Sequence, residues 1–415
     1  MTAPEIGIEA MDVYCGVAKV STRMLFEKRG LLPGRYDNLM MDERSVQMPW
    51  EDPVTNGVNA ARRIVENLEP AERDRIELLI TATESGLDYS KSIASYVHHY
   101  LGLPRTCRIL EVKQACYGTT GALQLAAAFL AAGLSPGAKA LVIATDVNPM
   151  DAHAEYAETT TGHGAVALLI GDRPGILALD LGAYGVNSFE TMDTARPRPD
   201  LDLYHADLSL LTYLECLGDS FRAYRSRVPD ADIVKSFDYL AMHTPFAGMV
   251  KAAHRKMMRE FAPRPPAAVA EDFEARVLPS LGYARTVGNL CSGSIYLALA
   301  AIVDSEPASA TAGAKVGLYS YGSGCASEFF SGRIVAGAAE RLAGHSIGPR
   351  LSVRRSLDFQ EYERVLPAAK ECLVPRADHQ VDLTGCDDYL EAVRSRGSVL
   401  VLRSIDNYHR RYEWR

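Results

Sequence analysis

The sequence predicts an α/β fold, in which apolar strands alternate with helices and form a mostly parallel sheet covered by helices on both faces. Short apolar runs and longer amphipathic stretches follow one another through most of the chain. The length of 415 residues exceeds that of a usual single domain and indicates two domains or one large duplicated unit. A hydrophobic fraction of 47% is typical of a globular protein with a sizeable core.

Charge and cysteine usage narrow the class of protein. The net charge of −8 excludes nucleic-acid binding by the molecule as a whole. The eight cysteines form no CxxC pair, which favours reduced thiols in the cytoplasm over disulfides or a zinc site. The first residues lack a basic segment followed by an apolar run, so no signal peptide is predicted. The longest apolar stretch, 122–132, is too short to span a bilayer, and we expect a soluble cytoplasmic protein.

Apolar runs in the first half predict strands separated by helices. The predicted strands are 6–20 with its turn, Arg75–Thr83, Arg108–Val112, Ala138–Thr145 and Gly164–Ile170. The predicted helices are Ser21–Arg29, Asn59–Glu69, Tyr89–Leu101 and the Ala/Leu-rich stretch that ends before Gly133, with loops at 34–54 and 146–162. The turn at Asp172–Gly175 predicts a boundary between one half at 1–172 and another at 173–415.

The second half repeats this alternation. Strands are predicted at 176–182, Phe237–Met242, Lys315–Ser320 and Ser327–Gly337, and helices at Ser209–Arg227, Met249–Phe261 and Ser294–Ile302. The proline-rich stretches 191–205 and 262–274 predict loops. The charged tail 350–415 is expected to be a peripheral cover with a final strand near 398–403.

Cys116 lies where a predicted strand passes into a predicted helix, next to small and flexible residues. The unpaired N–H groups and positive dipole end of a helix favour a thiolate, which is the nucleophilic form of cysteine. The same N–H groups can stabilise an oxyanion. A buried, inert cysteine is the alternative interpretation.

Three further polar residues follow apolar strands or precede helices: Glu84, His243 and Asn289. Each has a structural alternative, namely a solvated carboxylate, a core histidine and a helix N-cap. Glu84 and Cys116 occupy such positions in the first half, and His243 and Asn289 occupy them in the second half. This recurrence favours two similar halves with the site between them.

Several motifs in order resemble 3-hydroxy-3-methylglutaryl-CoA synthase, a member of the thiolase-like superfamily. They are TATESG (81–86), QACYGTT (114–120), TGHGAVA (161–167), HTPF (243–246), VGN with SGSIY (287–296) and YSYGSG (319–324). The resemblance covers about Ile6 to Gly337 and implies a five-layered αβαβα fold of two similar halves. Stretches such as VKQACYGTTGALQLAAAF are most similar to synthases that place a β-branch on a polyketide bound to acyl carrier protein.

The resemblance also implies roles for the matching residues. Cys116 accepts an acetyl group from a donor carrier protein, and Glu84 removes a proton from the acetyl methyl group. His243 binds the β-keto group of the acceptor, and hydrolysis then releases a 3-hydroxy-3-methylglutaryl-type product. The backbone N–H groups of Cys116 and Ser323 form the oxyanion hole. The implied substrate and oxyanion contacts are Asn289, Gly322 and Ser323.

The resemblance implies a donor and an acceptor acyl carrier protein as partners, a homodimer, and no metal or cofactor apart from the phosphopantetheine arm or CoA that carries the acyl group. Acyl carrier proteins are acidic, and the helix after His243 carries four cations that suit them: Lys251, Arg255, Lys256 and Arg259. These cations could also bind CoA phosphates or form a solvated face. Alternative functions are a primary-metabolism synthase using acetyl-CoA and acetoacetyl-CoA, an initiating ketosynthase, or an inactive scaffold.

Overall fold

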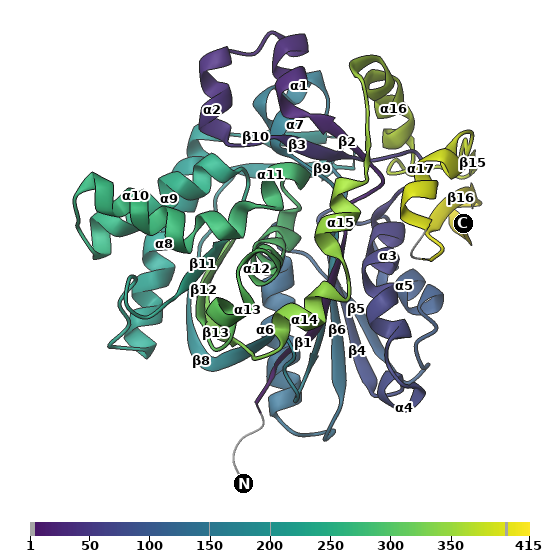
Figure 1. Cartoon of the computed structure of the whole chain (residues 1–415). Coiled ribbons are helices and arrows are strands. Elements are labelled where there is room, and N and C mark those ends of the chain that lie inside the picture. Colours follow the sequence, from purple (N-terminus) through teal and green to yellow (C-terminus); the bar gives the residue numbers. More distant parts are fainter. Residues whose placement is uncertain (1–4, 149, 200, 395–396) are drawn as a thin grey trace.

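The computed structural model describes residues 5–148, 150–199, 201–394 and 397–415, and a nine-stranded sheet lies at its centre (Figure 1). The sheet consists of β1 (Gly7–Tyr14), β4 (Ile76–Ala82), β5 (Arg108–Val112), β6 (Lys139–Asp146), β7 (Gly164–Gly171), β8 (Leu177–Ser188), β11 (Tyr239–Met242), β12 (Lys315–Gly322) and β13 (Ala326–Ile334). The strand order is β11-β12-β13-β8-β1-β7-β6-β4-β5. The strands predicted in 75–83, 108–112, 138–145 and 164–170 are confirmed. The strands at 138–145 and 164–170 are buried throughout, whereas Arg108–Val112 is a partly exposed edge strand of the sheet.

The sheet consists of two halves with the same pattern of pairing. In the first half β4 is parallel to β6, β6 is antiparallel to β7, and β7 is antiparallel to β1. In the second half β11, β12, β13 and β8 pair in the same sequence of directions. The halves meet where Gly7 and Ile8 pair with Ala178 and Leu177. The prediction of a mostly parallel sheet is therefore wrong, since apolar runs encode burial and not strand direction.

Helices form three layers around these half-sheets. The middle layer holds α6 (Gly118–Ala131) and α12 (Ser294–Ser305), which share one hydrophobic core with strands of both halves. The outer face of the first half packs on α3 (Pro53–Glu66) and α5 (Ala94–Tyr100), and that of the second half on α8 (Ala206–Arg227) and α9 (Ala247–Phe261). The resulting α-β-α-β-α order is the five-layered arrangement that the resemblance implies.

The amino-terminal ends of the two central helices meet. The hydroxyl of Thr119 lies 2.6 Å from that of Ser292, and the hydroxyl of Thr120 lies 2.9 Å from that of Tyr296. All four side chains belong to motifs that carry the resemblance. These bonds join the first turn of α6 to the first turn of α12 and to the short helical turn Cys291–Gly293 that precedes it.

Four stretches predicted as loops contain regular structure, and one of them, 146–162, contains α7 (Tyr156–Thr160). Residues 191–205 include a hairpin of β9 (Thr194–Arg198) and β10 (Leu201–Tyr204). Residues 262–274 include most of α10 (Pro266–Arg276), which begins at a proline, a residue that the first turn of a helix accommodates. The loop prediction at 34–54 missed α2 (Tyr36–Leu39) and β3 (Glu43–Val46), which pairs with β2 (Ala18–Ser21). Proline and glycine content alone does not separate these short elements from true loops.

The carboxy-terminal tail packs on the outside of the first half, beside α3 (Figure 1). The predicted strand near 398–403 is confirmed as β16, which pairs with β17. The tail contains β14 (Arg355–Ser356), α16 (Phe359–Glu371), β15 (His379–Gln380), α17 (Cys386–Arg394), β16 (Leu400–Asp406) and β17 (His409–Trp414). The helices before it, α14 (Ala338–Ala343) and α15 (Ile347–Ser352), pack against the central core. The remaining helices are α1 (Thr22–Arg29), α4 (Pro70–Arg73), α11 (Ala284–Val287) and α13 (Ala308–Thr311). Over the described ranges, each helix is too short or too polar to cross a membrane.

Asp52 binds side chains of this tail to the first half, and we expect its substitution to lower the stability of the protein. Its carboxylate accepts the backbone N–H of Thr55 at 2.9 Å, which caps α3. It also accepts hydrogen bonds from Arg410 at 3.0 Å and from the Tyr412 hydroxyl at 2.8 Å. Because Asp52 is fully buried, Asp52→Ala leaves a buried cation unpaired and should lower the free energy of unfolding by about 3–5 kcal/mol in urea titrations.

Asp358 provides the matched control. It caps α16 in the same way, by accepting the N–H of Glu361 at 2.8 Å, but it lies at the surface. Asp358→Ala should therefore cost about 1 kcal/mol. Equal losses for the two variants would contradict the assigned role of Asp52.

Candidate active site

Cys116 lies in a tight turn between β5 and α6. The backbone N–H of Tyr117 donates to the carbonyl of Gln114 at 3.0 Å, and that of Gly118 donates to the carbonyl of Ala115 at 3.2 Å. Ala115 has a φ of +41°, in the left-handed region that residues with a side chain seldom adopt. Since α6 begins at Gly118, its first N–H groups lie beside the partly exposed Cys116. The predicted strand-to-helix setting of the thiol is confirmed.

The end of β12 touches this turn at Gly322. A β-carbon on Gly322 would lie 2.5 Å from both the Gln114 oxygen and the Tyr117 nitrogen, so only glycine allows the approach. The buried carboxylate of Asp193 holds the following turn, because it accepts the Tyr321 hydroxyl at 2.5 Å and the N–H of Gly324 at 2.9 Å. Gly322 and Ser323 are thus brought to the Cys116 turn, while their role as oxyanion donors stays a prediction.

Glu84 follows β4, and a neighbouring carboxylate fixes its backbone. Asp146, the last residue of β6, accepts the N–H of Glu84 at 2.8 Å, the Thr83 hydroxyl at 3.0 Å and the Ser85 hydroxyl at 3.1 Å. Burial, and then the charge of Glu84, raise the pKa of Asp146. The sequence analysis missed Asp146, although it follows an apolar strand in the same way as Glu84 does. Its three contacts assign it to holding the turn that carries Glu84.

Glu84 and Cys116 meet in one cluster, together with a second thiol. The donor atoms of Glu84, Cys116 and Cys291 all lie within 4.8 Å of one another. The Cys291 sulfur lies 3.0 Å from Oε1 of Glu84 and donates to it. The sequence analysis counted Cys291 among the cysteines but gave it no role. A nucleophile and a base at this separation suit proton removal from a group bound to the nucleophile.

The ionisation of Cys116 differs from the expectation that a helix N-terminus favours the thiolate. Contact with Cys291 lowers the pKa of the Cys116 thiol, but burial and the negative charges of Glu84 and Asp146 raise it by more. The net pKa is above the ordinary value, so the resting site holds the protonated thiol. Burial and these charges therefore outweigh the helix dipole in the resting site.

His243 follows β11 and is anchored through its backbone. Its N–H donates to the Tyr319 carbonyl on β12 at 2.8 Å, and its carbonyl accepts the Tyr213 hydroxyl at 2.8 Å. Burial lowers the pKa of the imidazole to about 3, so the ring is neutral. Among the described residues, Nδ1 of this ring has no hydrogen-bond partner. A neutral ring with an unused nitrogen suits hydrogen bonding to an uncharged carbonyl.

Asn289 is engaged in the turn that presents Cys291. Its side-chain oxygen accepts the backbone N–H of Cys291 at 2.9 Å and the Ser294 hydroxyl at 2.8 Å. Its backbone pairs with the 160–162 segment, where the N–H of Asn289 donates to the Thr160 carbonyl at 2.8 Å. Because α12 begins at Ser294, Asn289 is not the N-cap of that helix. Its direct contact with a substrate stays a prediction.

Arg196, on β9 of the hairpin that was predicted as a loop, covers Glu84. Its Nε donates to Asp202 at 2.7 Å, and one of its terminal nitrogens donates to the Ser85 hydroxyl at 2.9 Å. The other terminal nitrogen donates to the Asn148 side chain and lies 3.7 Å from Oε1 of Glu84. The hairpin thus places a buried cation beside Glu84. No pattern in the sequence of 191–205 indicates this contact.

Two cavities adjoin predicted site residues. One of about 640 Å³ reaches Glu84 between the β9–β10 hairpin and the tail, and its lining includes Lys113, Arg196, Arg376 and Tyr408. Another of about 450 Å³ lies between α9 and α10 and is lined by Lys251, Arg255 and Arg259. Lys256 does not line it and pairs with Glu260 at 2.9 Å. Three of the four predicted cations therefore share one surface.

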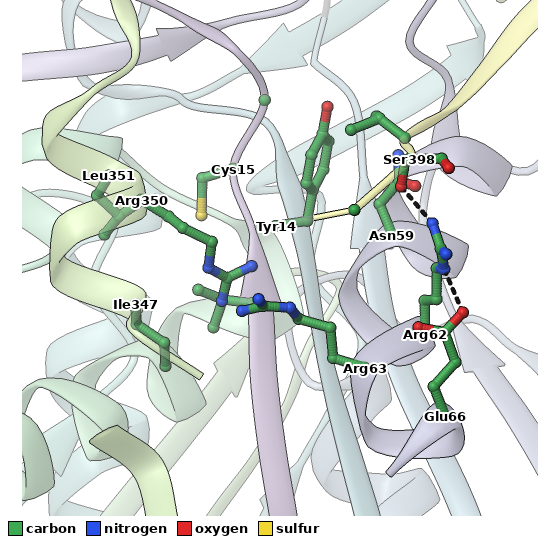
Figure 2. Close-up of a pocket in the computed structure, with 14 residues that line it drawn as sticks. Tyr14, Cys15, Asn59, Arg62, Arg63, Glu66, Ile347, Arg350, Leu351 and Ser398 are labelled. Atoms are coloured by element: carbon green, nitrogen blue, oxygen red, sulfur yellow. Dashed lines mark hydrogen bonds and ion pairs between the residues drawn. The ribbon is translucent and has the colours of Figure 1, made fainter. Parts of the chain in front are cut away.

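A recess of about 70 Å³ lies between α3 and α15 (Figure 2). Arg62, Arg63 and Arg350 contribute to it, and Arg62 is bound to Glu66 at 2.6 Å and to the carbonyl of Ser398. The recess contains none of the predicted site residues. It is separate from the Glu84–Cys116–Cys291 cluster.

Glu328 binds residues next to the turn that carries Cys116, and its carboxyl group makes the stability of the protein depend on pH. It accepts the Tyr117 hydroxyl and the Gln124 amide, each at 2.7 Å. Burial raises its pKa from 4.5 to about 7. Between these values the folded state binds more protons than the unfolded state, so stability is fully present below about pH 4.5 and is lost as the pH rises through about 7. The expected loss is about 3 kcal/mol, measured by urea unfolding across this range.

Glu51 is a second group of the same kind, because burial also raises its pKa to about 7. Glu328→Gln should therefore reduce the change of unfolding free energy with pH. It should not abolish this change, because Glu51 still titrates in the same range. An unchanged curve for Glu328→Gln would contradict the raised pKa of this carboxyl.

Two protein-family models together match most of the chain. A model described as hydroxymethylglutaryl-coenzyme A synthase N terminal matches residues 3–174, and one described as hydroxymethylglutaryl-coenzyme A synthase C terminal matches residues 262–414. The chain is 43% identical over 417 residues to polyketide biosynthesis 3-hydroxy-3-methylglutaryl-ACP synthase PksG of Bacillus subtilis, covering 98% of this chain and 99% of that one. It is 34% identical over 366 residues to a hydroxymethylglutaryl-CoA synthase of Enterococcus faecalis, covering 86% and 90%.

Solved structures of hydroxymethylglutaryl synthases are also similar to this chain. The HMG synthase of the curacin biosynthetic pathway, in complex with apo donor-ACP, matches with a TM-score of 0.95 and 44% identity over 99% of this chain and 100% of that one. MvaS in complex with 3-hydroxy-3-methylglutaryl coenzyme A matches with a TM-score of 0.87 and 33% identity over 99% of each chain. The similarity covers both halves of the fold.

Proposed function

We propose that this chain, which belongs to the hydroxymethylglutaryl-CoA synthase family, adds an acetyl group to the β-keto group of a polyketide carried by an acyl carrier protein. It is a C–C bond-forming acyltransferase. The observation that carries the chemistry is the closeness of Glu84 to Cys116. The polyketide setting is supported by higher identity to the PksG and curacin enzymes, at 43% and 44%, than to the Enterococcus enzyme, at 34%.

In the first step, the Cys116 sulfur attacks the thioester carbonyl of an acetyl group on the donor. The new C–S bond forms to Cys116, the bond to the donor sulfur breaks, and the Cys116 proton leaves on the donor thiol. The backbone N–H groups of Cys116 and Ser323 stabilise the oxyanion. Because the thiol is protonated at rest, its proton leaves only as the thioester enters, which limits side reactions of a free thiolate.

In the second step, Glu84 removes a proton from the methyl group of acetyl-Cys116. The enolate carbon attacks the β-keto carbon of the acceptor and forms the C–C bond, while the ketone oxygen takes up the electron pair. His243 donates a hydrogen bond to this oxygen, Asn289 orients the acceptor thioester, and the proton held by Glu84 neutralises the alkoxide. Water then cleaves the thioester, which restores the Cys116 thiol and leaves a carboxylate on the branched product.

The acyl groups reach the site on a phosphopantetheine arm or on CoA, and the reaction needs no metal or redox cofactor. The cavity between α9 and α10 supports an acidic carrier protein as the partner, because Lys251, Arg255 and Arg259 line it and α9 follows His243 directly in the chain. The donor and the acceptor carrier protein would use this surface in turn.

A face of exposed apolar side chains supports a homodimer. Leu125 on α6 and Leu181 and Val186 on β8 are 62%, 47% and 44% exposed, and they line a groove together with Tyr184. Exposed apolar patches of this kind mark protein–protein contacts. The partner we propose for this face is a second copy of the chain.

The test of the function compares two acetyl donors by intact-protein mass spectrometry. Acetyl-carrier protein should label Cys116 rapidly, and acetyl-CoA should label it slowly. Efficient labelling by acetyl-CoA alone would instead favour a primary-metabolism synthase.

Charge reversal on α9 tests the carrier surface. Arg255→Glu with Arg259→Glu should raise KM for acetyl-carrier protein about tenfold with little change in kcat, because both side chains are exposed and steer an acidic partner. Acetyl-pantetheine, which lacks the protein, should label Cys116 at the wild-type rate. Lys256→Glu is the matched control on the same helix, since Lys256 does not line the cavity. An equal effect of Lys256→Glu would contradict this assignment.

A further inference from the structure

Cys291 is a buried thiol inside the site that the proposed reaction does not use. Its side chain is 2% exposed, and its sulfur donates to Oε1 of Glu84 at 3.0 Å. The side-chain amide of Asn148 donates to the same sulfur at 3.3 Å. The thiol therefore lies between the amide that donates to it and the carboxylate that accepts its hydrogen bond.

The backbone at Cys291 is built to hold this position. Cys291 has a φ of +47°, which is costly for a residue with a side chain. The hydrogen bond from its N–H to the Asn289 side chain at 2.9 Å and the short helical turn Cys291–Gly293 stabilise that conformation. Asn289 thus acts on Glu84 through Cys291.

The two contacts that hold the Glu84 carboxylate reach the same oxygen. Cys291 donates to Oε1, and Arg196 lies 3.7 Å from Oε1. Arg196 is itself fixed by Asp202 and Ser85. With Oε1 held in this way, Oε2 is the oxygen that we assign to the acetyl group on Cys116.

Cys291 keeps its proton, as a hydrogen-bond donor must. The hydrogen bond with Cys116, burial and the charge of Glu84 raise the pKa of Cys291 well above its ordinary value. The two neighbouring thiols therefore differ in function, because Cys116 exchanges its proton for an acetyl group and Cys291 retains its own.

We propose that Cys291 is a positioning residue, whose thiol holds Oε1 of Glu84 so that Oε2 faces the methyl group of acetyl-Cys116. This inference rests on the proposed function, in which Glu84 is the base. Without the thiol, the carboxylate turns towards Arg196, its remaining partner, and away from the acetyl group. Proton removal then slows. Acetylation slows as well, because the contact with Cys291 that lowers the pKa of the Cys116 thiol is lost, so the proposal concerns the loss of exchange beyond that of acetylation.

The experiment separates these two steps. Acetyl-carrier protein is added to the enzyme in D₂O with a reductant and a chelator, because the three donor atoms within 4.8 Å could otherwise share a metal ion or the thiols could oxidise. Mass spectrometry of the Cys116 peptide reports the acetyl adduct and the deuterium in its methyl group. Deuterium enters when Glu84 takes a proton and returns a deuteron.

Cys291→Ala should acetylate more slowly, because it loses the contact that lowers the pKa of the Cys116 thiol. Once acetylated, it should exchange its methyl protons about tenfold more slowly than the acetylated wild type, the size of effect expected for one hydrogen bond to a charged group. Cys291→Ser keeps a donor and should restore most of the exchange. Cys107→Ala, a buried thiol before β5, is the matched control and should change neither rate.

Normal exchange in Cys291→Ala would overturn the proposal. So would an equal loss of acetylation and exchange that Cys291→Ser does not rescue, because that result describes a purely structural cysteine. A wild-type enzyme that takes up no acetyl group would contradict the proposed function itself, and the two failures are therefore distinguishable.

Discussion

Glu84→Gln should leave Cys116 able to accept an acetyl group and abolish every later step. The amide is nearly the same size as the carboxylate and can still accept the Cys291 hydrogen bond, but it cannot take a proton from a methyl group. Condensation should fall on the order of a thousandfold or more, and deuterium should no longer enter the acetyl methyl group. Rapid-quench mass spectrometry measures the adduct and the product together.

Glu111 gives the control for this substitution. It is a neighbouring carboxylate on β5 that accepts the N–H of Ile93 at 2.9 Å, and it lies outside the cluster. Glu111→Gln should retain condensation. Condensation by Glu84→Gln at a rate near that of the wild type would remove Glu84 as the base.

Cys116→Ala should abolish the acetyl adduct and the condensation together. Its sulfur is the atom to which the acetyl group is transferred, so its removal leaves only the binding of the two substrates. The expected loss of kcat is on the order of a thousandfold or more. Intact-protein mass spectrometry of the variant after incubation with acetyl-carrier protein measures this directly.

Cys291 is the alternative nucleophile to be tested beside Cys116, because both thiols belong to the same cluster. A persistent adduct in Cys116→Ala that disappears in Cys291→Ala would show that the nucleophile is Cys291 instead. Exposure argues against that exchange of roles, because Cys291 is 2% exposed whereas Cys116 is partly exposed.

The local features of the fold were predictable from the sequence. Runs such as Ala138–Thr145 and Gly164–Ile170 were recognisable as strands because helices cover both faces of the sheet, so these strands are buried and mostly apolar. The direction of each strand depends on how the chain returns between layers, and apolar runs carry no such information. The prediction of a mostly parallel sheet failed for this reason, as β7 and β1 show.

The site was predictable to the extent that its residues follow strands. Glu84 and Cys116 stand at strand ends, and the structure brings them together. Asp146 offered the same signal after 138–145 and was passed over. Cys291 and Arg196 gave no local signal, because their contacts with Glu84 join residues 207 and more than 100 positions apart in the chain.

The ionisation of Cys116 shows a second limit of sequence reasoning. A helix N-terminus is visible in the sequence and predicts a thiolate. The opposing contributions, burial and the charges of Glu84 and Asp146, appear only when three separate strands are assembled. The structure therefore indicates a Cys116 thiol that is protonated at rest.

The central claim is that this chain transfers an acetyl group from one carrier protein to the β-keto group on another. The most direct measurement is intact-protein mass spectrometry of an acceptor carrier protein loaded with a β-ketoacyl chain, after incubation with the enzyme and acetyl-donor carrier protein. The account predicts that the acceptor gains the mass of one acetic acid molecule (C₂H₄O₂), and that Glu84→Gln and Cys116→Ala prevent the gain. An acceptor of unchanged mass, beside an enzyme that is acetylated on Cys116, would contradict it.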